Sequence, residues 1–146
     1  MGNINAARSE GFDEGLDFEN ICQGPLPDSA LKGIKLFNER LYWEAHEALE
    51  RAWLEESGAA RHLYKGVLQA GVMYLQIQRE NFIGMAKMYE RASRWLSPWP
   101  EFCRGIHVGK LRRDIEIAIK SAGQLGPDKL GEFDQSLFKI LEMEKS

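Results

Sequence analysis

The segment from about residue 60 to residue 79 is the feature that most constrains the fold of this chain. Its apolar residues cover most of a helical circumference, and Lys65, Gln69 and Gln76 lie along one narrow polar strip. A helix on the surface of a protein is apolar along one stripe only, so a helix with this pattern must be surrounded by other elements. The segment therefore predicts the central helix of a bundle.

Capping residues, apolar periodicity and the positions of proline and glycine predict further helices on both sides. Asp28 or Ser29 can cap the first of them, and Asn81 can cap a helix that must end before Pro98. The predicted helices cover about residues 28–40, 42–56, 60–79, 82–96, 108–122 and 128–144. No segment alternates with period two, and several turns are short. We therefore predict an all-α fold, a compact antiparallel bundle of about five to six helices.

Length and composition indicate how the chain is organised. With 146 residues it fits one domain, predicted at 28–146, and residues 1–27 are predicted as a loosely ordered N-terminal arm. Cys22 and Cys103 lie far apart and outside any paired-cysteine motif, so we expect free thiols.

Charge and hydropathy exclude two classes of partner. The formal net charge is −3 and no basic stripe is present, so we expect no nucleic-acid binding. No apolar run is long enough to cross a bilayer and the N-terminus lacks an apolar signal core, so we expect no membrane partner and a cytoplasmic location. A homodimer would be ordinary for a bundle of this size.

The second predicted helix carries the candidate site. On a helical wheel its apolar arc contains Trp43 and Trp53 and also encloses His46 and Glu50, with Glu47 at the edge of the arc. The wheel sends the other acidic side chains of this helix, including that of Glu44, to the opposite face. A partly buried cluster of His46, Glu47 and Glu50 is therefore expected.

A carboxylate against aromatic rings needs a hydrogen bond, a counter-charge or a metal ion, because otherwise its pKa rises until it binds a proton. His46 lies four residues before Glu50, on the same face, and can supply the first two. The pair is consistent with a structural contact, with a general base and its orienting partner, or with two ligands of a divalent metal ion. In the run from His46 to Glu50, only His46 and Glu47 match the zincin motif, so that mechanism is not implied.

Other residues offer fewer clues. Gln69 can reach the His46 cluster if the neighbouring helices pack antiparallel. His62 and His107 are potential ligands that we do not favour, and the charged run at 110–114 is interpreted as solvated surface. The large aromatic residues can fill the core or line a pocket; they are Trp43, Trp53, Tyr64, Tyr74, Trp95 and Trp99.

The run Tyr42-Trp43-Glu44-Ala45-His46-Glu47, followed by Leu49-Glu50 and Trp53, resembles the signature of the domain-of-unknown-function 309 family of bacterial and archaeal proteins. Tyr64 to Ala70 resembles its second block, and shorter matches extend the resemblance over about residues 34–120. The resemblance implies an all-α fold in a family without an established activity, sometimes labelled a predicted metal-dependent hydrolase. The polar residues it marks are Glu44, His46, Glu47, Glu50 and Gln69, with Trp43 and Trp53 beside them.

Three functional hypotheses follow. In the first, His46, Glu50 and Gln69 form a buried polar network that shapes a small-molecule pocket, whose ligand is unknown. In the second, a metal-dependent hydrolase uses His46 and Glu50 as metal ligands and Glu47 as general base, and needs a further ligand from elsewhere. In the third, exposed tryptophans make the protein an interaction module.

Overall fold

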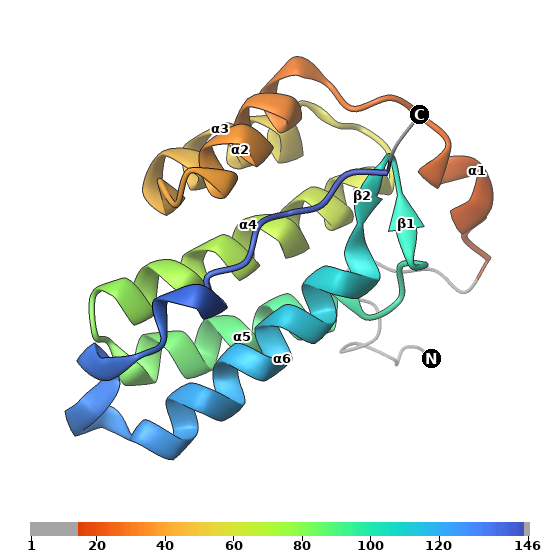
Figure 1. Cartoon of the computed structure of the whole chain (residues 1–146). Coiled ribbons are helices and arrows are strands. Elements are labelled where there is room, and N and C mark those ends of the chain that lie inside the picture. The colour runs from red at the N-terminus through yellow and green to blue at the C-terminus, as the bar shows by residue number, and fades with distance from the viewer. Residues whose placement is uncertain (1–14, 145–146) are drawn as a thin grey trace.

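The structure is a computed structural model that describes residues 15–144, and it is a bundle of helices with one short hairpin (Figure 1). The short helix α1 comes first, and five longer helices follow it: α1 (Phe18–Cys22), α2 (Asp28–Asn38), α3 (Tyr42–Glu55), α4 (Ala60–Gln78), α5 (Phe82–Leu96) and α6 (Val108–Leu125). The all-α prediction is confirmed, and five of the predicted helices are present with bounds close to those expected.

Short turns join α3, α4 and α5 into successive antiparallel hairpins, and residues with unusual backbone angles make two of the turns in the bundle. Arg40 after α2 and Glu80 after α4 have φ values of 63° and 56°. Asn81 begins α5 as predicted, because its side chain accepts a hydrogen bond from the Gly84 amide at 2.9 Å. These turns place α4 between α3 and α5 (Figure 1).

A glycine sets the distance between α4 and α5. A Cβ atom at Gly66 would lie 2.7 Å from the Leu96 side chain and 3.3 Å from the Cβ of Trp95. No larger residue fits there unless α5 moves away. The close approach brings Trp95 over the edge of α4, next to Lys65.

The two long sides of α4 have different surroundings. Nine residues separate Lys65 from Tyr74, which places them about 180° apart around the helix. The Tyr74 side is covered by the C-terminal segment, whose Phe138 ring lies 5.4 Å from the Tyr74 ring and 6.0 Å from the Tyr42 ring. In Figure 1 this segment, in dark blue, runs along α4. The Lys65 side is the stripe of α4 that the bundle leaves accessible, and we call it the open side of α4; its residues are Arg61, His62, Lys65, Leu68, Val72, Gln76 and Arg79.

The prediction of a final helix over about 128–144 is wrong. The chain instead forms two 3-10 helices, η1 (Pro127–Glu132) and η2 (Gln135–Leu137), followed by extended backbone. Asp134 accepts hydrogen bonds from the amide and hydroxyl of Ser136, and Gly131 interrupts the apolar pattern. The apolar residues that suggested a helix, such as Phe138 and Leu141, are buried against the bundle from this irregular segment.

The prediction of two free thiols is also wrong. Cys22 and Cys103 form a disulfide with an S–S distance of 1.99 Å. Proximity in space, which sequence spacing does not reveal, brings them together: Cys22 ends α1, and Cys103 lies in the hairpin of β1 (Phe102–Cys103) and β2 (Ile106–His107). Such bonds persist mainly in oxidising compartments. The cytoplasmic location therefore stays a prediction.

Arg104 attaches the N-terminal region to the same end of the bundle. Its guanidinium donates to the carbonyl oxygens of Ile21 and Pro25 and to the Tyr64 hydroxyl, at 2.8, 3.2 and 3.1 Å. An ion pair with Glu56 at 3.5 Å completes its contacts. Part of the predicted N-terminal arm thus forms α1 and is held to the bundle, whereas residues 1–14 lie outside the described residues.

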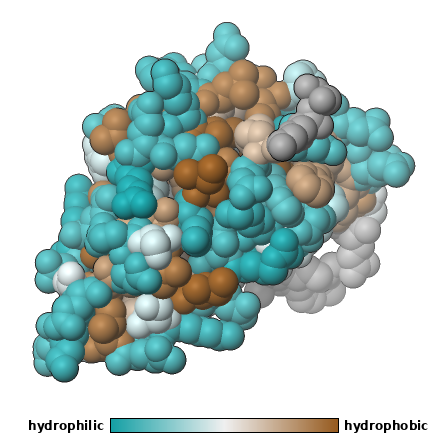
Figure 2. Space-filling model, viewed as in Figure 1, coloured by the Kyte–Doolittle hydropathy of each residue, from teal (hydrophilic) through white to brown (hydrophobic). Residues whose placement is uncertain are grey.

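The surface over which the C-terminal segment runs is mainly hydrophilic, with small separate hydrophobic patches (Figure 2). No helix in residues 15–144 is long and apolar enough to cross a membrane.

Candidate functional site

The predicted cluster on α3 is more exposed than the wheel suggested. His46 is half-buried, whereas Glu47 and Glu50 are exposed and Trp43 is 49% exposed. The residues of α3 that are buried are Tyr42, Ala45, Leu49 and Ala52. This face is narrower than the predicted apolar arc, because α3 packs its small residues against its neighbours and leaves the arc's outer edge in solvent. Glu50 therefore does not need the buried partner that we expected.

The expected His46–Glu50 pair is absent as well. Within residues 15–144, no hydrogen bond or ion pair joins His46 to Glu47 or Glu50. The same part of the chain contains no group of three or more His, Cys, Asp or Glu side chains placed to hold a metal ion. The ligand shell that the hydrolase hypothesis requires is therefore not assembled by these residues.

Gln69 is buried, as the first functional hypothesis predicted, with 8% of its surface exposed, but it does not join His46. His62 and Gln76 lie seven residues before and after Gln69, so all three share one edge of α4. That edge faces α5, because the His62 ring stacks on Trp95 at 5.0 Å and the Gln76 amide oxygen accepts from Asn81 at 3.1 Å. His46 lies at the opposite edge, on α3. The predicted network of His46, Glu50 and Gln69 is therefore not formed.

The most concentrated arrangement of functional groups lies on the open side of α4, where α3, α4 and α5 meet. The Lys65 ammonium lies 5.4 Å from the centre of the Trp53 ring and 4.5 Å from that of Trp95. The Arg61 guanidinium lies 5.3 Å from the Trp53 ring. We call these residues, together with His62, the Lys65 cluster; its members are Trp53, Arg61, His62, Lys65 and Trp95.

Positive charge at the Lys65 cluster is not balanced by acidic side chains. In the part of the chain that the structure describes, neither Arg61 nor Lys65 forms an ion pair with a carboxylate. The pKa of the His62 imidazole is lowered, first by burial and then by the neighbouring charges of Arg61 and Lys65. His62 is therefore neutral at pH 7, and the local field favours an anion.

Two buried polar atoms next to this cluster lack hydrogen bonds. Among residues 15–144, the amide oxygen of Gln69, one helical turn from Lys65, has no hydrogen-bond partner, and neither has the Arg61 Nε. A buried polar atom without a partner costs about 1–3 kcal/mol, so native proteins rarely keep one unless a water or a ligand can satisfy it.

A smaller group with similar composition lies further along the open side. The Trp43 ring stacks on the His46 ring at 5.1 Å, and the Arg79 guanidinium lies 5.9 Å from the Trp43 ring. The His46 Nδ1 is buried without a hydrogen bond. His46 and Trp43 are thus placed together as the sequence suggested, but their charged neighbour is Arg79 rather than Glu50.

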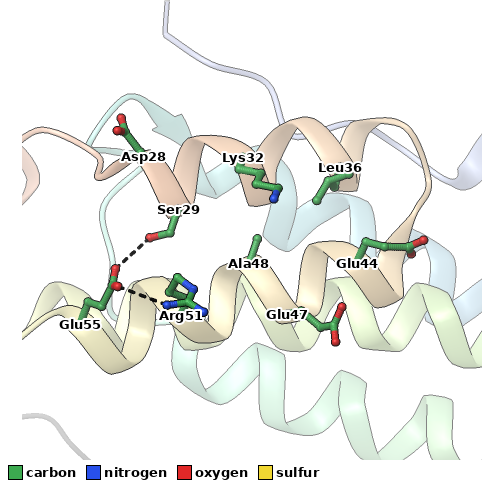
Figure 3. Close-up of a pocket in the computed structure, with 9 residues that line it drawn as sticks. All are labelled: Asp28, Ser29, Lys32, Leu36, Glu44, Glu47, Ala48, Arg51 and Glu55. Atoms are coloured by element: carbon green, nitrogen blue, oxygen red, sulfur yellow. Dashed lines mark hydrogen bonds and ion pairs between the residues drawn. The ribbon is translucent and has the colours of Figure 1, made fainter.

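An open groove of about 740 Å³ lies on the other side of α3, between α2 and α3 (Figure 3). Glu55 accepts from the Ser29 hydroxyl at 3.4 Å and pairs with Arg51 at 3.7 Å. The other residues that line the groove are Asp28, Lys32, Leu36, Glu44, Glu47 and Ala48. Figure 3 shows Glu44 and Glu47 as neighbours on α3. Charges of both signs line the groove, and no buried polar group points into it.

The third histidine belongs to a surface ion-pair group. Glu101 accepts from the His107 Nε2 and from Arg113, both at 2.8 Å. These two bonds hold the pKa of the Glu101 carboxyl at about 2. Lys110 pairs with Asp114 at 2.6 Å. The prediction that the charged run at 110–114 is solvated surface therefore holds for Arg113, which is exposed, but is wrong for Asp114, which is buried with 8% of its surface exposed.

The sequence indicates several residues of the Lys65 cluster separately, but it does not predict that they lie close together. Lys65 was placed on the polar strip of the central helix, and Trp53 and Trp95 were among the aromatic residues that could line a pocket. Arg61 was not singled out. The available signal was the spacing of Arg61, Lys65 and Gln69, which at four residues each lie on one side of a helix.

Comparisons with known proteins identify a family and nothing more specific. Residues 30–88 match the family described as "Domain of unknown function (DUF309)", which confirms the resemblance over that part of the chain. The match spans α2, α3 and α4 and the first part of α5, and so includes His46, Lys65 and Gln69. Neither the curated proteins nor the solved structures contain a match.

Proposed function

We propose that the Lys65 cluster of this chain, whose residues 30–88 match the DUF309 family, binds a small anionic ligand with a flat aromatic or apolar part. One observation carries the proposal: the Lys65 ammonium lies between two tryptophan rings and has no carboxylate partner among residues 15–144. The proposal develops the small-molecule hypothesis and moves its centre from His46 to Lys65.

The chemistry of the cluster matches such a ligand in three ways. An anionic group can accept charge-assisted hydrogen bonds from Arg61 and Lys65, which are stronger than neutral ones. A flat ring can pack on the exposed part of the Trp53 indole, which is partly buried at the edge of the site. The Gln69 amide oxygen is buried and has no partner among residues 15–144, so a donor group on the ligand would satisfy it once the covering side chains move aside.

Binding is favoured over catalysis by the composition of the site. The cluster contains two cations and two indole rings, together with a histidine whose pKa is lowered, and no carboxylate that could act as a general base. A small ligand is favoured over nucleic acid, because the net charge of −3 provides no extended basic surface for a phosphate backbone.

A fluorescence titration with anilinonaphthalene sulfonate tests this function, since that probe carries both an arylsulfonate and flat rings. We expect saturable binding with one probe per chain. Lys65→Gln, which removes the charge and leaves a somewhat shorter polar side chain, should weaken binding by at least about tenfold, the worth of one charge-assisted hydrogen bond. Lys65→Arg should restore most of the affinity.

The matched control is Lys87→Gln. Lys87 is exposed on α5 and forms no contact with the cluster, so its variant should bind the probe like the unmodified protein. Equal affinities for Lys65→Gln and Lys87→Gln would contradict the proposed function, as would binding in proportion to probe concentration without saturation.

A further inference from the structure

The first described residues of the chain lie at the same end of the bundle as the Lys65 cluster. The Phe18 ring of α1 contacts the Trp99 ring at 5.0 Å, and Trp99 lies in the turn that follows α5, four residues after Trp95. On the other flank, Arg104 connects the Ile21 carbonyl to the hydroxyl of Tyr64, the residue that precedes Lys65. The Cys22–Cys103 disulfide fixes this placement covalently.

The chain that precedes α1 has the composition of a ligand for this cluster. Residues 10–14 read Glu-Gly-Phe-Asp-Glu, so three carboxylates flank one aromatic ring. An anionic group beside a flat ring is the chemistry that the proposed function assigns to the site. Glu14 is four residues from Phe18, and a chain of that length spans at most about 14 Å.

We propose that the segment at residues 10–14 binds the Lys65 cluster of its own chain and competes there with the small anionic ligand. Its carboxylates pair with Arg61 and Lys65, and the Phe12 ring packs against an indole of the cluster. Because the segment is tethered close to the site, its effective concentration is of millimolar order, and a weak contact is enough to occupy the cluster. The competition rests on the proposed function, whereas the contact itself does not.

Zero-length cross-linking tests the contact directly in the full-length protein. A carbodiimide joins a lysine ammonium to a carboxylate only when the two are in contact. Peptide mass spectrometry should therefore find amide bonds from Lys65 to Glu10, Asp13 or Glu14. Lys87 serves as the internal control, and cross-links from Lys87 as frequent as those from Lys65 would overturn the proposal.

A mixture of isotopically labelled and unlabelled protein separates contact within one chain from contact between two chains. Cross-linked peptides should carry either both labels or none. Peptides that combine one labelled and one unlabelled partner would show that the segment of a second copy occupies the cluster, which would overturn binding within the chain.

Probe titration tests the competition. In the full-length variant Glu10→Gln/Asp13→Asn/Glu14→Gln, we expect the affinity for anilinonaphthalene sulfonate to rise by roughly five- to tenfold. An unchanged affinity would overturn the competition. If neither protein binds the probe but the Lys65 cross-links are present, the proposed function fails while the docking of the segment stands.

Discussion

The two sides of α4 bury polar atoms in different settings. On the side covered by the C-terminal segment, the hydroxyls of Tyr42 and Tyr74 are buried without hydrogen bonds and lie among aromatic rings. Next to the open side, the Gln69 amide oxygen equally has no partner in the described part of the chain, but the Lys65 ammonium, which forms no ion pair with the described carboxylates, lies one turn away. An unpaired buried atom alone marks imperfect packing. Its combination with a cation that has no acidic partner among residues 15–144 is the difference on which the proposed binding site rests.

The pKa values reflect the same contrast. Burial raises the pKa of both Tyr42 and Tyr74, and each rise is increased by a neighbouring group, Tyr74 for Tyr42 and Asp114 for Tyr74. The Lys139 backbone slightly opposes the rise at Tyr74, but no well-formed hydrogen bond joins the two. On the open side, burial and two cations lower the pKa of His62. The covered side therefore excludes charge, and the open side favours negative charge.

The largest effect is expected on the covered side. Phe138→Ala should lower the free energy of unfolding by about 4 kcal/mol, because it removes a side chain that is 4% exposed and packs on two tyrosine rings. Urea unfolding measures the change. Ile140→Ala is the control, since Ile140 is 50% exposed and should change stability by less than about 0.5 kcal/mol. Equal effects would mean that the segment does not cover α4 as described.

The next largest effect is expected at the Cys22–Cys103 disulfide, which joins α1 to the hairpin at one end of the bundle. Cys22→Ser/Cys103→Ser should lower the free energy of unfolding by about 2–4 kcal/mol, because the disulfide closes a loop between residues 81 apart. Calorimetry with and without a reductant measures the loss. The reductant should reproduce it in the unmodified protein and have no effect on the double variant. A melting temperature that does not respond to either change would contradict the structure at this bond.

The buried hydroxyls predict how stability depends on pH. Their folded-state pKa is higher than the value of 10 in the unfolded chain, so their contribution is fully present below pH 10 and is lost as the pH rises above it. Tyr42→Phe/Tyr74→Phe should reduce this alkaline loss of stability. At pH 7 the variant should be within about 1 kcal/mol of the unmodified protein, because no hydrogen bond is removed. Melting temperatures between pH 7 and 11 measure both effects, and an unchanged slope above pH 10 would show that other groups cause the loss.

The smallest effect on stability is expected for Gln69→Leu, and it tests most directly whether the open side of α4 differs from the covered side. Gln69→Leu should raise the free energy of unfolding by about 1 kcal/mol, because it removes a buried oxygen that has no partner. The same variant should bind anilinonaphthalene sulfonate more weakly. Gln78→Leu, at an exposed position, should change neither property. If Gln69→Leu destabilises the protein, the amide has a structural partner and the open side does not differ from the covered side.

Much of the fold could be predicted from the sequence, because periodicity and capping act over a few residues. Asn81 caps α5 by a contact with the residue three positions later, and α4 shows its central place through its own apolar circumference. The C-terminal segment could not be predicted in this way. Its phenylalanines have helix-like spacing but gain their stability from Tyr42 and Tyr74, which are far away in sequence.

The candidate site was predicted less well, for a related reason. A helical wheel shows which residues share a face of α3. The width of the buried face depends on how closely the neighbouring helices pack, and this packing leaves Glu50 exposed. Likewise, the side chains of Trp53 and Trp95 belong to different helices, and only the close approach at Gly66 brings Trp95 over Lys65. The sequence shows that Trp53, Lys65 and Trp95 are present, but their proximity depends on how the helices pack.

The most direct test of the binding site uses the indole N–H signals of the four tryptophans, followed by nuclear magnetic resonance during titration with anilinonaphthalene sulfonate. Each signal can be assigned by a Trp→Phe variant. We predict that Trp53 and Trp95 shift together and saturate at one equivalent, that Lys65→Gln needs at least about tenfold more probe to give the same shifts, and that Trp99, which is 2% exposed, does not move. Shifts at Trp43 without shifts at Trp53 and Trp95, or no saturable shift at all, would contradict a ligand site at the Lys65 cluster.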